Sequence, residues 1–491
     1  MLFNSFPFIA VFLPTTFILA QAARRLAGLR VELLTISAAS LVFYGLWDIR
    51  YLPLLIGSIA ANFWLAGRIL AAATPRSAAH WLAWGVALNL AILGLFKYAH
   101  FVAATLAALA GQPPPFAALQ LPLAISFITF QKIAYLVDCR RGRVAEHNAL
   151  DYLFFVSFFP QLIAGPIVHH RPLIAQTQAA ANPLFKDPAV PAAALFFFAA
   201  GLFKKVVLAD SLARYATPVF DLAQHASPTA DHAWQATLAY TLQLYFDFSG
   251  YSDMAIGLAL LFGFRLPINF NSPYRATSLI EFWRRWHITL SAFLRDYLYI
   301  PLGGNRQGHY RNIALTMLLA GLWHGAGWTF IAWGAAHGAL LLGNHAWRAG
   351  LNRMPRLRTA WHATPALLPA ALTFACVALA WVLFRAADLG SALRIYQALL
   401  FSPPTWPGTD DLLAAFLDAR PPAAWLWIAL GLAVAWLVPN TAALANYDPT
   451  PNAPWRQRPG AMLGLAAAAA LWISLKWMAV QPPTEFLYFQ F

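Results

Sequence analysis

The stretch EFWRRWHITLSAFLRDYLYIPLGGNRQGHYRNIALTMLLAGLWHGAGWTFIAWGAAHGALLLGNH, residues 281–345, is the part around which the rest of this chain is organised. Its first third carries ionisable side chains among Trp and Phe: Glu281, Arg284, Arg285, His287, Arg295 and Asp296. Its last third is apolar and contains His324. Only 11% of the chain is charged. Ionisable residues inside a membrane are costly and indicate a functional site by default. We therefore expect residues 281–345 to form the functional core segment.

Composition predicts the fold class. Of the 491 residues, 60% are hydrophobic and 15% aromatic, and the mean hydropathy is +0.57. A soluble domain has roughly half apolar and about a quarter charged residues. Apolar runs of roughly 20 residues cross a bilayer, and their backbone must satisfy its own hydrogen bonds as helices. We predict an all-α polytopic membrane protein with about twelve spans.

The net charge of +14 does not indicate nucleic-acid binding, because the Arg and Lys residues lie in short loops, where they set membrane topology. After the first run the basic residues Arg24, Arg25 and Arg30 place the first loop in the cytoplasm and the N-terminus outside. Cys139 and Cys376 give neither zinc spacing nor a disulfide framework. No metal site is predicted, since the histidines lack an HExxH or HxxxH spacing.

The expected spans follow one another without an internal repeat or a soluble domain. They cover about Asn4–Ala22, Val31–Trp47, Tyr51–Leu70, His80–His100, Leu121–Val137, Leu153–Val168, Leu195–Leu208, Trp234–Phe264, Ile313–His345, Pro369–Phe384, Trp425–Val438 and Met462–Met478. Pro160 and Gly165-Pro166 predict a broken or re-entrant helix in the sixth run, and Gly325 and Gly327 interrupt the ninth. The amphipathic stretch 281–300 is too charged to span and is expected at the membrane interface or dipping into the protein.

Within the eighth run, Asp247 and Asp253 are six residues apart. On one straight helix they point to opposite faces, unless Gly250 breaks it. We expect each carboxylate to bond a neighbouring helix and not to act as a pair.

Two histidines are the candidates for chemistry. His324 lies within an apolar run between glycines that would leave room for a ligand. Because burial favours the neutral imidazole, it could accept a proton from a hydroxyl or thiol. Structural hydrogen bonding is an equally good interpretation of a lone intramembrane histidine. His287 lies beside Arg284 and Arg285, and His337 is expected to pack.

The chain also resembles the membrane-bound O-acyltransferases (MBOATs), in particular the bacterial alginate O-acetyltransferase branch. The resemblance covers nearly the whole length and rests on an ordered series of motifs: SLVFYGLWDIRYL (41–53), LGLFKYAHF (93–101), ISFITFQKIAYLVD (125–138), FFPQLIAGPIV (158–168), GLFKKVVLAD (201–210), LYFDFSGYSDMAIGLALLFGFRLPINFNSPY (244–274), EFWRRWHITLSAFLRDYLYIPLGGNR (281–306) and GLWHGAGWTF (321–330).

The resemblance implies a single integral-membrane domain over residues 1–491, with interfacial or re-entrant helices around a central tunnel. Residues 281–345 would be its catalytic core segment. An acyl donor would enter from the cytoplasm and an acceptor from outside. His324 falls on the family's catalytic histidine and His287 on its second signature histidine. The implied activity is that of an inner-membrane O-acetyltransferase for an exported polysaccharide such as alginate.

The last residues, FLYFQF at 486–491, form an aromatic tail expected at the outer face. Taken alone it is an interfacial anchor. It is similar to a terminal motif of relatives that export acyl groups, whose tyrosine is proposed to carry the acyl group in the D-alanylation system. By this likeness Tyr488 would carry an acetyl group to a periplasmic SGNH-like acetyltransferase.

The implied donor is acetyl-CoA, a substrate and not a bound cofactor. Its phosphates would be held by the basic residues Lys204, Lys205 and Arg284. Membrane lipid is a further expected partner, and nucleic acid is not. The close alternative is peptidoglycan O-acetylation by the same chemistry. A proton-coupled transporter and a non-catalytic scaffold are alternatives from other classes, and the transporter lacks the expected repeats.

Overall fold

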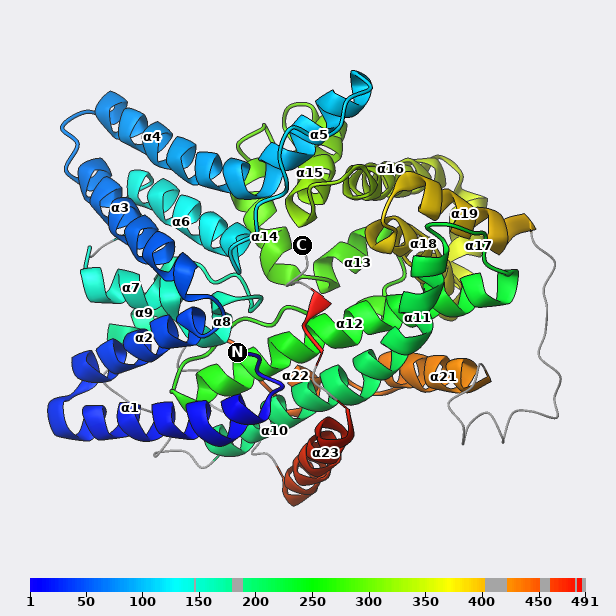
Figure 1. The fold of residues 1–491 in the computed structure, drawn as a ribbon. Coiled ribbons are helices and arrows are strands. Elements are labelled where there is room, and N and C mark those ends of the chain that lie inside the picture. The colour runs from blue at the N-terminus through cyan, green and yellow to red at the C-terminus, as the bar shows by residue number, and fades with distance from the viewer. Residues whose placement is uncertain (145–146, 179–188, 402–421, 451–459, 482–483, 488–491) are drawn as a thin grey trace. The chain divides into compact units, whose positions relative to one another are not determined.

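The chain is built of helices. The structure, a computed structural model, describes residues 1–144, 147–178, 189–401, 422–450, 460–481 and 484–487, and no strand occurs among them. The helices labelled in Figure 1 belong to two compact units of the chain. The first comprises residues 1–202, 251–267 and 445–490, and the second comprises residues 203–250 and 268–444.

The first unit contains the N-terminal helices and the C-terminal helix. Its helices are η1 (Phe8–Phe12), α1 (Leu13–Ala27), α2 (Leu29–Gly45), η2 (Ile49–Tyr51), α3 (Leu52–Leu70), α4 (Pro75–Leu93), η3 (Gly94–Tyr98), α5 (Ala99–Leu109), α6 (Ile125–Arg140), α7 (Ala149–Ser157), α8 (Phe159–Leu162), α9 (His170–Gln178), α10 (Ala189–Phe203, all but its last residue) and α23 (Ala461–Val480). The turns η1 and η3 are π-helical.

The second unit contains the predicted core segment. Its helices are η5 (Lys204–Ala209), α11 (Asp210–Leu222), η6 (Pro273–Arg275), α13 (Leu279–Arg285), α14 (Ile288–Leu294), η7 (Arg295–Tyr299), α15 (His309–His324), α16 (Trp328–Arg353), α17 (Pro355–Ala363), α18 (Leu367–Arg385), α19 (Leu389–Phe401), α21 (Pro422–Leu437) and α22 (Thr441–Leu444). Helix α12 (Ala230–Leu261) contributes residues to both units.

The all-α polytopic class is confirmed. In the described part of the chain, six helices are long and apolar enough to cross a membrane: Phe8–Ala27, Ile49–Leu70, Pro75–Leu109, Ala189–Leu222, Leu367–Arg385 and Ala461–Val480. Each coincides with a predicted run. The other predicted runs are also helical, although most are shorter or more polar. The number of spans therefore stays a prediction.

Two interruptions were expected and occur, in the sixth and the ninth run, whereas the division of residues 281–300 was not predicted. The sixth run is split into α7 and α8, with the chain breaking at Phe158. The ninth run becomes α15 and α16, separated by residues 325–327. The amphipathic stretch 281–300 is divided into α13, α14 and the π-helical η7. By contrast, α12 continues unbroken through Gly250.

Phenylalanine rings form the centre of the first unit. Phe3 packs against Phe8 at 4.9 Å between ring centroids and against Phe43 at 5.5 Å. Phe3 also stacks on Tyr251 at 5.0 Å, and Tyr251 in turn meets Phe486 edge-on at 4.8 Å. The buried start of the C-terminal tail therefore belongs to this aromatic cluster.

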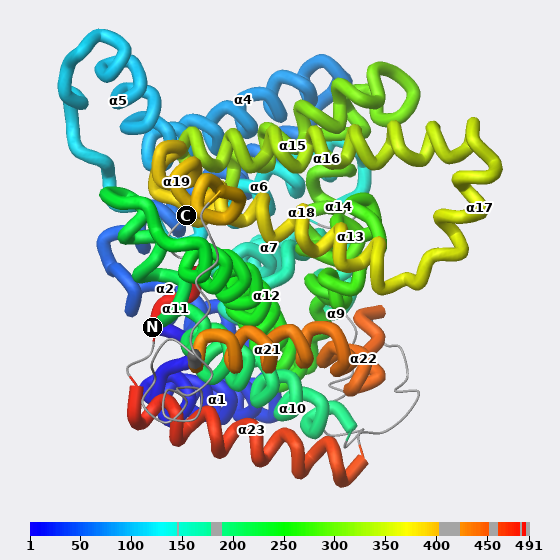
Figure 2. The backbone as a smooth tube through the Cα atoms, turned by 90° about the vertical axis from the view of Figure 1, so that its right-hand side faces the viewer, coloured from blue at the N-terminus to red at the C-terminus, as the bar shows by residue number. Residues whose placement is uncertain are grey.

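The helices α15 and α16 of the second unit pack closely along most of their length (Figure 2). Two glycines, Gly321 in α15 and Gly334 in α16, allow the two backbones to approach so closely. A methyl group on Gly334 would lie less than 3.0 Å from the carbonyl oxygen of Met317, and one on Gly321 would collide with the carbonyl oxygen of Phe330. Small residues let helix backbones approach in this way within membrane proteins. The contact fixes the hairpin whose turn follows His324.

We predict that Gly334→Ala destabilises the protein by about 1–3 kcal/mol, because the methyl group meets backbone atoms that cannot move aside. The matched control is Gly338→Ala one turn later, where a methyl group would lie at ordinary distance, 3.6 Å, from the Met317 Cβ atom. Thermal unfolding in detergent, followed by tryptophan fluorescence, compares the variants. Equal midpoints for the two would contradict this account of the contact.

Candidate functional site

His287 sits in a sharp turn between α13 and α14. Its φ is 43° and its ψ is 54°, the left-handed region that non-glycine residues rarely adopt. Backbone hydrogen bonds hold this turn against the loop at 269–271. The Ile288 N–H donates to the Asn269 carbonyl and the Asn271 N–H to the Arg285 carbonyl, both at 2.9 Å. Such strain costs about 1–3 kcal/mol and is concentrated at functional sites.

The Asn269 side chain orients the His287 ring. Asn269 Oδ1 accepts from the Thr289 hydroxyl at 2.9 Å and from the Thr289 N–H at 3.3 Å. The amide oxygen must therefore face this side, since an amide N–H could not accept these bonds. His287 Nδ1 lies 3.1 Å from the same oxygen, so Nδ1 carries the proton. The neutral ring then presents Nε2 as a proton acceptor.

Burial keeps His287 neutral. Its side chain is fully buried, and burial lowers the pKa of its imidazole to about 3. The turn lies outside the candidate spans. The ring meets Phe248 of α12 edge-on, 4.7 Å between centroids. In this structure the imidazole is therefore a neutral, oriented base in an apolar setting.

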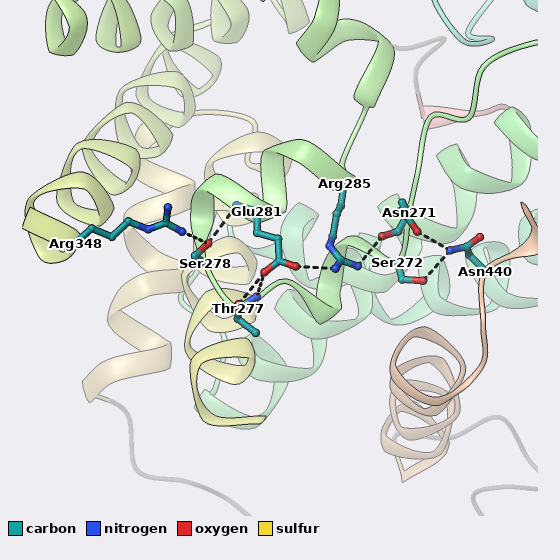
Figure 3. Close-up of polar contacts among 8 residues, drawn as sticks. All are labelled: Asn271, Ser272, Thr277, Ser278, Glu281, Arg285, Arg348 and Asn440. Carbon is teal, nitrogen blue, oxygen red and sulfur yellow. Dashed lines mark hydrogen bonds and ion pairs between the residues drawn. The ribbon is translucent and has the colours of Figure 1, made fainter. Parts of the chain in front are cut away.

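A polar network holds α13, which precedes His287 (Figure 3). Glu281 forms an ion pair with Arg285 at 2.7 Å and accepts two bonds of 2.8 Å from Thr277. Arg285 also donates to the Asn271 carbonyl at 3.3 Å. Burial alone would raise the pKa of Glu281, but the bonds from Thr277 and Arg285 hold it below its usual value. These charges position the turn and are already satisfied.

His324 is the last residue of α15 and is 4% exposed. Its ring contacts Trp323, Trp333 and Phe384 at centroid distances of 4.8, 5.1 and 5.2 Å, each edge to face. The room expected beside it at Gly325 is not there. The Phe330 ring fills the position that a Gly325 side chain would take, which makes glycine necessary for packing. That expectation was wrong at Gly325.

Tryptophans connect three histidines of the second unit. Trp323 adjoins His324 and also contacts the His287 ring at 6.5 Å. On the other side, Trp333 contacts both His324 and His337, at 5.1 and 4.9 Å. His337 is fully buried among aromatic rings, as predicted, and neither of its ring nitrogens has a hydrogen-bond partner among the described residues. The fold thus brings both candidate histidines to one indole.

Lys205 has a structural environment that does not suit donor binding. Its side chain is 2% exposed, and its ammonium group forms ion pairs of 2.8 Å with Asp210 and with Asp247 of α12. Two carboxylates already neutralise it, which argues against the phosphate role of Lys205, and that role stays a prediction. The expectation that Asp247 bonds a neighbouring helix is met.

The other two predicted donor residues remain accessible. Lys204 is partly buried and donates to the Thr441 hydroxyl at 2.8 Å, and Arg284 is exposed on α13. Their proposed role is a prediction. Among the described residues, no group of three or more His, Cys, Asp or Glu side chains is arranged to hold a metal ion.

Tyr488 lies outside the described residues, but the residues before it are held within the first unit. Phe486 is 1% exposed and Leu487 is 8% exposed. The Asn4 side-chain amide donates to the Thr484 carbonyl at 3.1 Å. The start of the tail is therefore bound by protein and not simply spread on a membrane surface.

Sequence reasoning missed Asn269, Trp333 and Phe384 as partners of the histidines. Asn269 stands in the quoted motif INFNSPY, where its polar side chain between apolar residues was a usable signal. Trp333 and Phe384 carry none, since tryptophan and phenylalanine recur throughout this chain.

Comparison with known proteins identifies relatives. Residues 76–384 match the membrane-bound O-acyltransferase family. A peptidoglycan O-acetyltransferase of Helicobacter pylori is 44% identical over 432 residues, covering 82% of this chain and 80% of that protein. A probable alginate O-acetylase of Pseudomonas putida is 40% identical and covers 100% of both chains. A teichoic acid D-alanyltransferase of Streptococcus thermophilus is 30% identical and covers 48% of this chain and 62% of that protein.

The buried state of His287 predicts a pH dependence of stability. The folded pKa of about 3 is below the value of about 6.5 in an unfolded chain, so between these values the unfolded state binds more protons. Stability is complete above about pH 6.5 and falls as the pH drops towards 3, by at most roughly 1.4 kcal/mol per pH unit. The variant His287→Asn tolerates the left-handed backbone but cannot titrate. We expect its apparent unfolding midpoint to depend less on pH between about 4 and 6.5.

The control is His225→Asn, at an exposed histidine. It should follow the unsubstituted protein across the same pH range. If His287→Asn also follows it, His287 is not buried as a neutral ring.

Proposed function

Because the chain belongs to the membrane-bound O-acyltransferase family and is therefore a multi-pass membrane acyltransferase, we propose that it O-acetylates an exported polysaccharide from the bacterial inner membrane. The donor is acetyl-CoA on the cytoplasmic side. The observation that carries this proposal is the placement of His324. It is buried among aromatic rings at the end of α15, with His287 on the other side of Trp323.

His324 acts as the general base in this proposal. An imidazole surrounded by apolar rings accepts a proton from an attacking hydroxyl without competition from water. The carboxyl end of a helix stabilises the positive charge that then forms on the ring. His287, neutral and held by Asn269, offers Nε2 as a second oriented acceptor near the reacting groups. Its contribution is orientation and hydrogen bonding at the same site.

The acetyl group leaves the membrane protein through Tyr488. The Tyr488 phenol gives its proton to His324, and its oxygen attacks the thioester carbonyl. The carbon–sulfur bond breaks, and the CoA thiolate takes the proton from the imidazolium. The acetyl-tyrosine ester then passes its acetyl group to a hydroxyl nucleophile of a periplasmic SGNH-like acetyltransferase. A covalent carrier divides a difficult transfer into two easier steps. Phe486 is buried and the Thr484 carbonyl accepts a hydrogen bond from Asn4, so the start of the tail has a defined position. This supports a specific role for the tail.

Lys204 and Arg284 are the remaining candidates for holding donor phosphates. Lys204 donates to the Thr441 hydroxyl and is partly buried, and Arg284 is exposed. An accessible guanidinium or ammonium binds phosphate oxygens through charge-assisted hydrogen bonds. Family membership favours the acyltransferase over the transporter and the scaffold considered from sequence.

Alginate is our first candidate polymer and peptidoglycan is the second. The second has specific support, since the peptidoglycan O-acetyltransferase is as similar to this chain as the alginate O-acetylases are. Both candidates use the same donor and the same histidines. Acetyl analysis of each polymer, in cells with and without the gene, separates them.

We predict that His324→Ala abolishes acetyl transfer from radiolabelled acetyl-CoA, with a loss of about 10²-fold or more, because the general base is removed. The matched control is His337→Phe, at a buried histidine that also packs against Trp333 but has no role in the proposal. It should retain most of the activity. Comparable activity for the His324 variant and the unsubstituted protein would refute the base role.

A second variant tests the carrier. Tyr488→Phe keeps the ring and removes the nucleophilic oxygen, so transfer to the polymer should stop while the protein still inserts. Mass spectrometry of the C-terminal peptide after incubation with acetyl-CoA should show an acetyl ester, and the ester should be absent from the variant. Tyr310→Phe, at an exposed tyrosine, is the control. Normal acetylation by Tyr488→Phe would contradict the carrier role and leave the tail as an interfacial anchor.

A further inference from the structure

A pocket of about 480 Å³ lies in the second unit, and neither His287, His324 nor His337 lines it. It is formed where α16 ends, α17 turns away and α18 begins. Its polar and aromatic lining includes Ser278, Trp347, Arg348, Arg358, Trp361 and His362. Figure 2 shows α17 (yellow) leading away from the end of α16 and back towards α18.

The pocket is basic and no acidic side chain lines it. The chain contains no Asp or Glu between Asp296 and Asp388, whereas the elbow at 346–363 contains Arg348, Arg353, Arg356 and Arg358. Arg348 donates to the Ser278 hydroxyl at 3.2 Å (Figure 3). A guanidinium has five N–H donors, so this bond orients Arg348 and leaves further donors for an anion. The pocket therefore has a positive charge that no acidic residue of the elbow balances.

The pocket also has the features of a membrane boundary. Helix α18 is one of the candidate spans, and its first residues Leu367 and Leu368 are 64% and 48% exposed. The indoles of Trp347 and Trp361 meet edge-on at 5.2 Å on the pocket wall. Tryptophan is enriched at the interface of a bilayer, and arginine-rich short loops lie on its cytoplasmic side. A ligand in this pocket would have apolar helix surface beside it and arginines around its polar end.

We propose that this pocket binds the phosphate headgroup of an anionic phospholipid of the cytoplasmic leaflet. Arg348 and Arg358 bind the phosphate oxygens, the Trp347–Trp361 pair sits at headgroup level, and the acyl chains lie along the exposed leucines of α18. Anionic headgroups bind basic pockets beside membrane helices through this combination of charge and apolar contact. The same phosphate chemistry occurs in coenzyme A, which has no acyl chains to cover Leu367 and Leu368. The apolar wall therefore favours the lipid.

The elbow offers a charge-matched pair of variants. Arg348→Gln with Arg358→Gln removes the two pocket arginines. Arg353→Gln with Arg356→Gln removes two exposed arginines of the same elbow that do not line the pocket. Native mass spectrometry of the full chain in neutral detergent measures the retention of phosphatidylglycerol, with phosphatidylcholine as the zwitterionic comparison. We expect the pocket variant to lose about tenfold or more of its affinity for phosphatidylglycerol, and the other variant less than about threefold.

Three outcomes would overturn the proposal. Equal losses in the two variants would indicate diffuse surface charge in place of a site. Equal retention of phosphatidylcholine would remove the role of the net charge. Loss of coenzyme A binding in the pocket variant, with phosphatidylglycerol retained, would assign the phosphate site to the nucleotide. Should the double variant fail to fold, Arg358→Gln alone makes the same comparison against Arg356→Gln. Arg348→Lys with Arg358→Lys should restore part of the affinity, because charge returns without the planar fork.

Discussion

Two helix backbones can touch only where side chains are absent, and this constraint determines the second unit. Gly321 and Gly334 leave no space between α15 and α16 for even one methyl group. The hairpin therefore turns within residues 325–327, and His324 ends one helix while Trp333 faces it from the other. The Phe330 ring fills the space beside Gly325, which closes the turn. The position of the catalytic candidate is thus a consequence of close helix packing.

The two candidate histidines are held by opposite kinds of interaction. His324 is surrounded by aromatic rings, which exclude water and restrict the orientation of the imidazole by packing. His287 is fixed by hydrogen bonds through Asn269 and by a strained backbone that a polar network maintains. Packing alone leaves the tautomer of a ring undetermined, whereas a carbonyl acceptor selects it. An acyl transfer site needs both effects, since it must exclude water and orient the lone pair of an imidazole nitrogen towards the proton that it accepts.

Charges in this protein fall into two groups. Lys205 with Asp210 and Asp247, and Glu281 with Arg285, are paired and serve to position helices. Removing one partner of such a pair would leave a buried charge uncompensated, which is costly. The arginines of the elbow at 346–363 have no acidic residues beside them in the sequence. A local excess of positive charge at a membrane interface attracts anionic lipid.

Hydropathy and helix breakers act over short distances, so the amino-acid sequence was enough to predict the membrane class, the helical runs and the two candidate histidines. The break at 325–327 and the packing role of His337 were predicted correctly, whereas the break in the sixth run was expected at Pro160 or Gly165-Pro166 and lies at Phe158. The sequence did not show that Lys205 is neutralised by Asp247, that Asn269 holds His287, or that Phe330 occupies the room beside Gly325. Those facts join residues separated in sequence by 42, 18 and 5 positions. These contacts depend on the fold, because the partner of a side chain is set by which helix faces lie opposite it, and composition leaves that choice open.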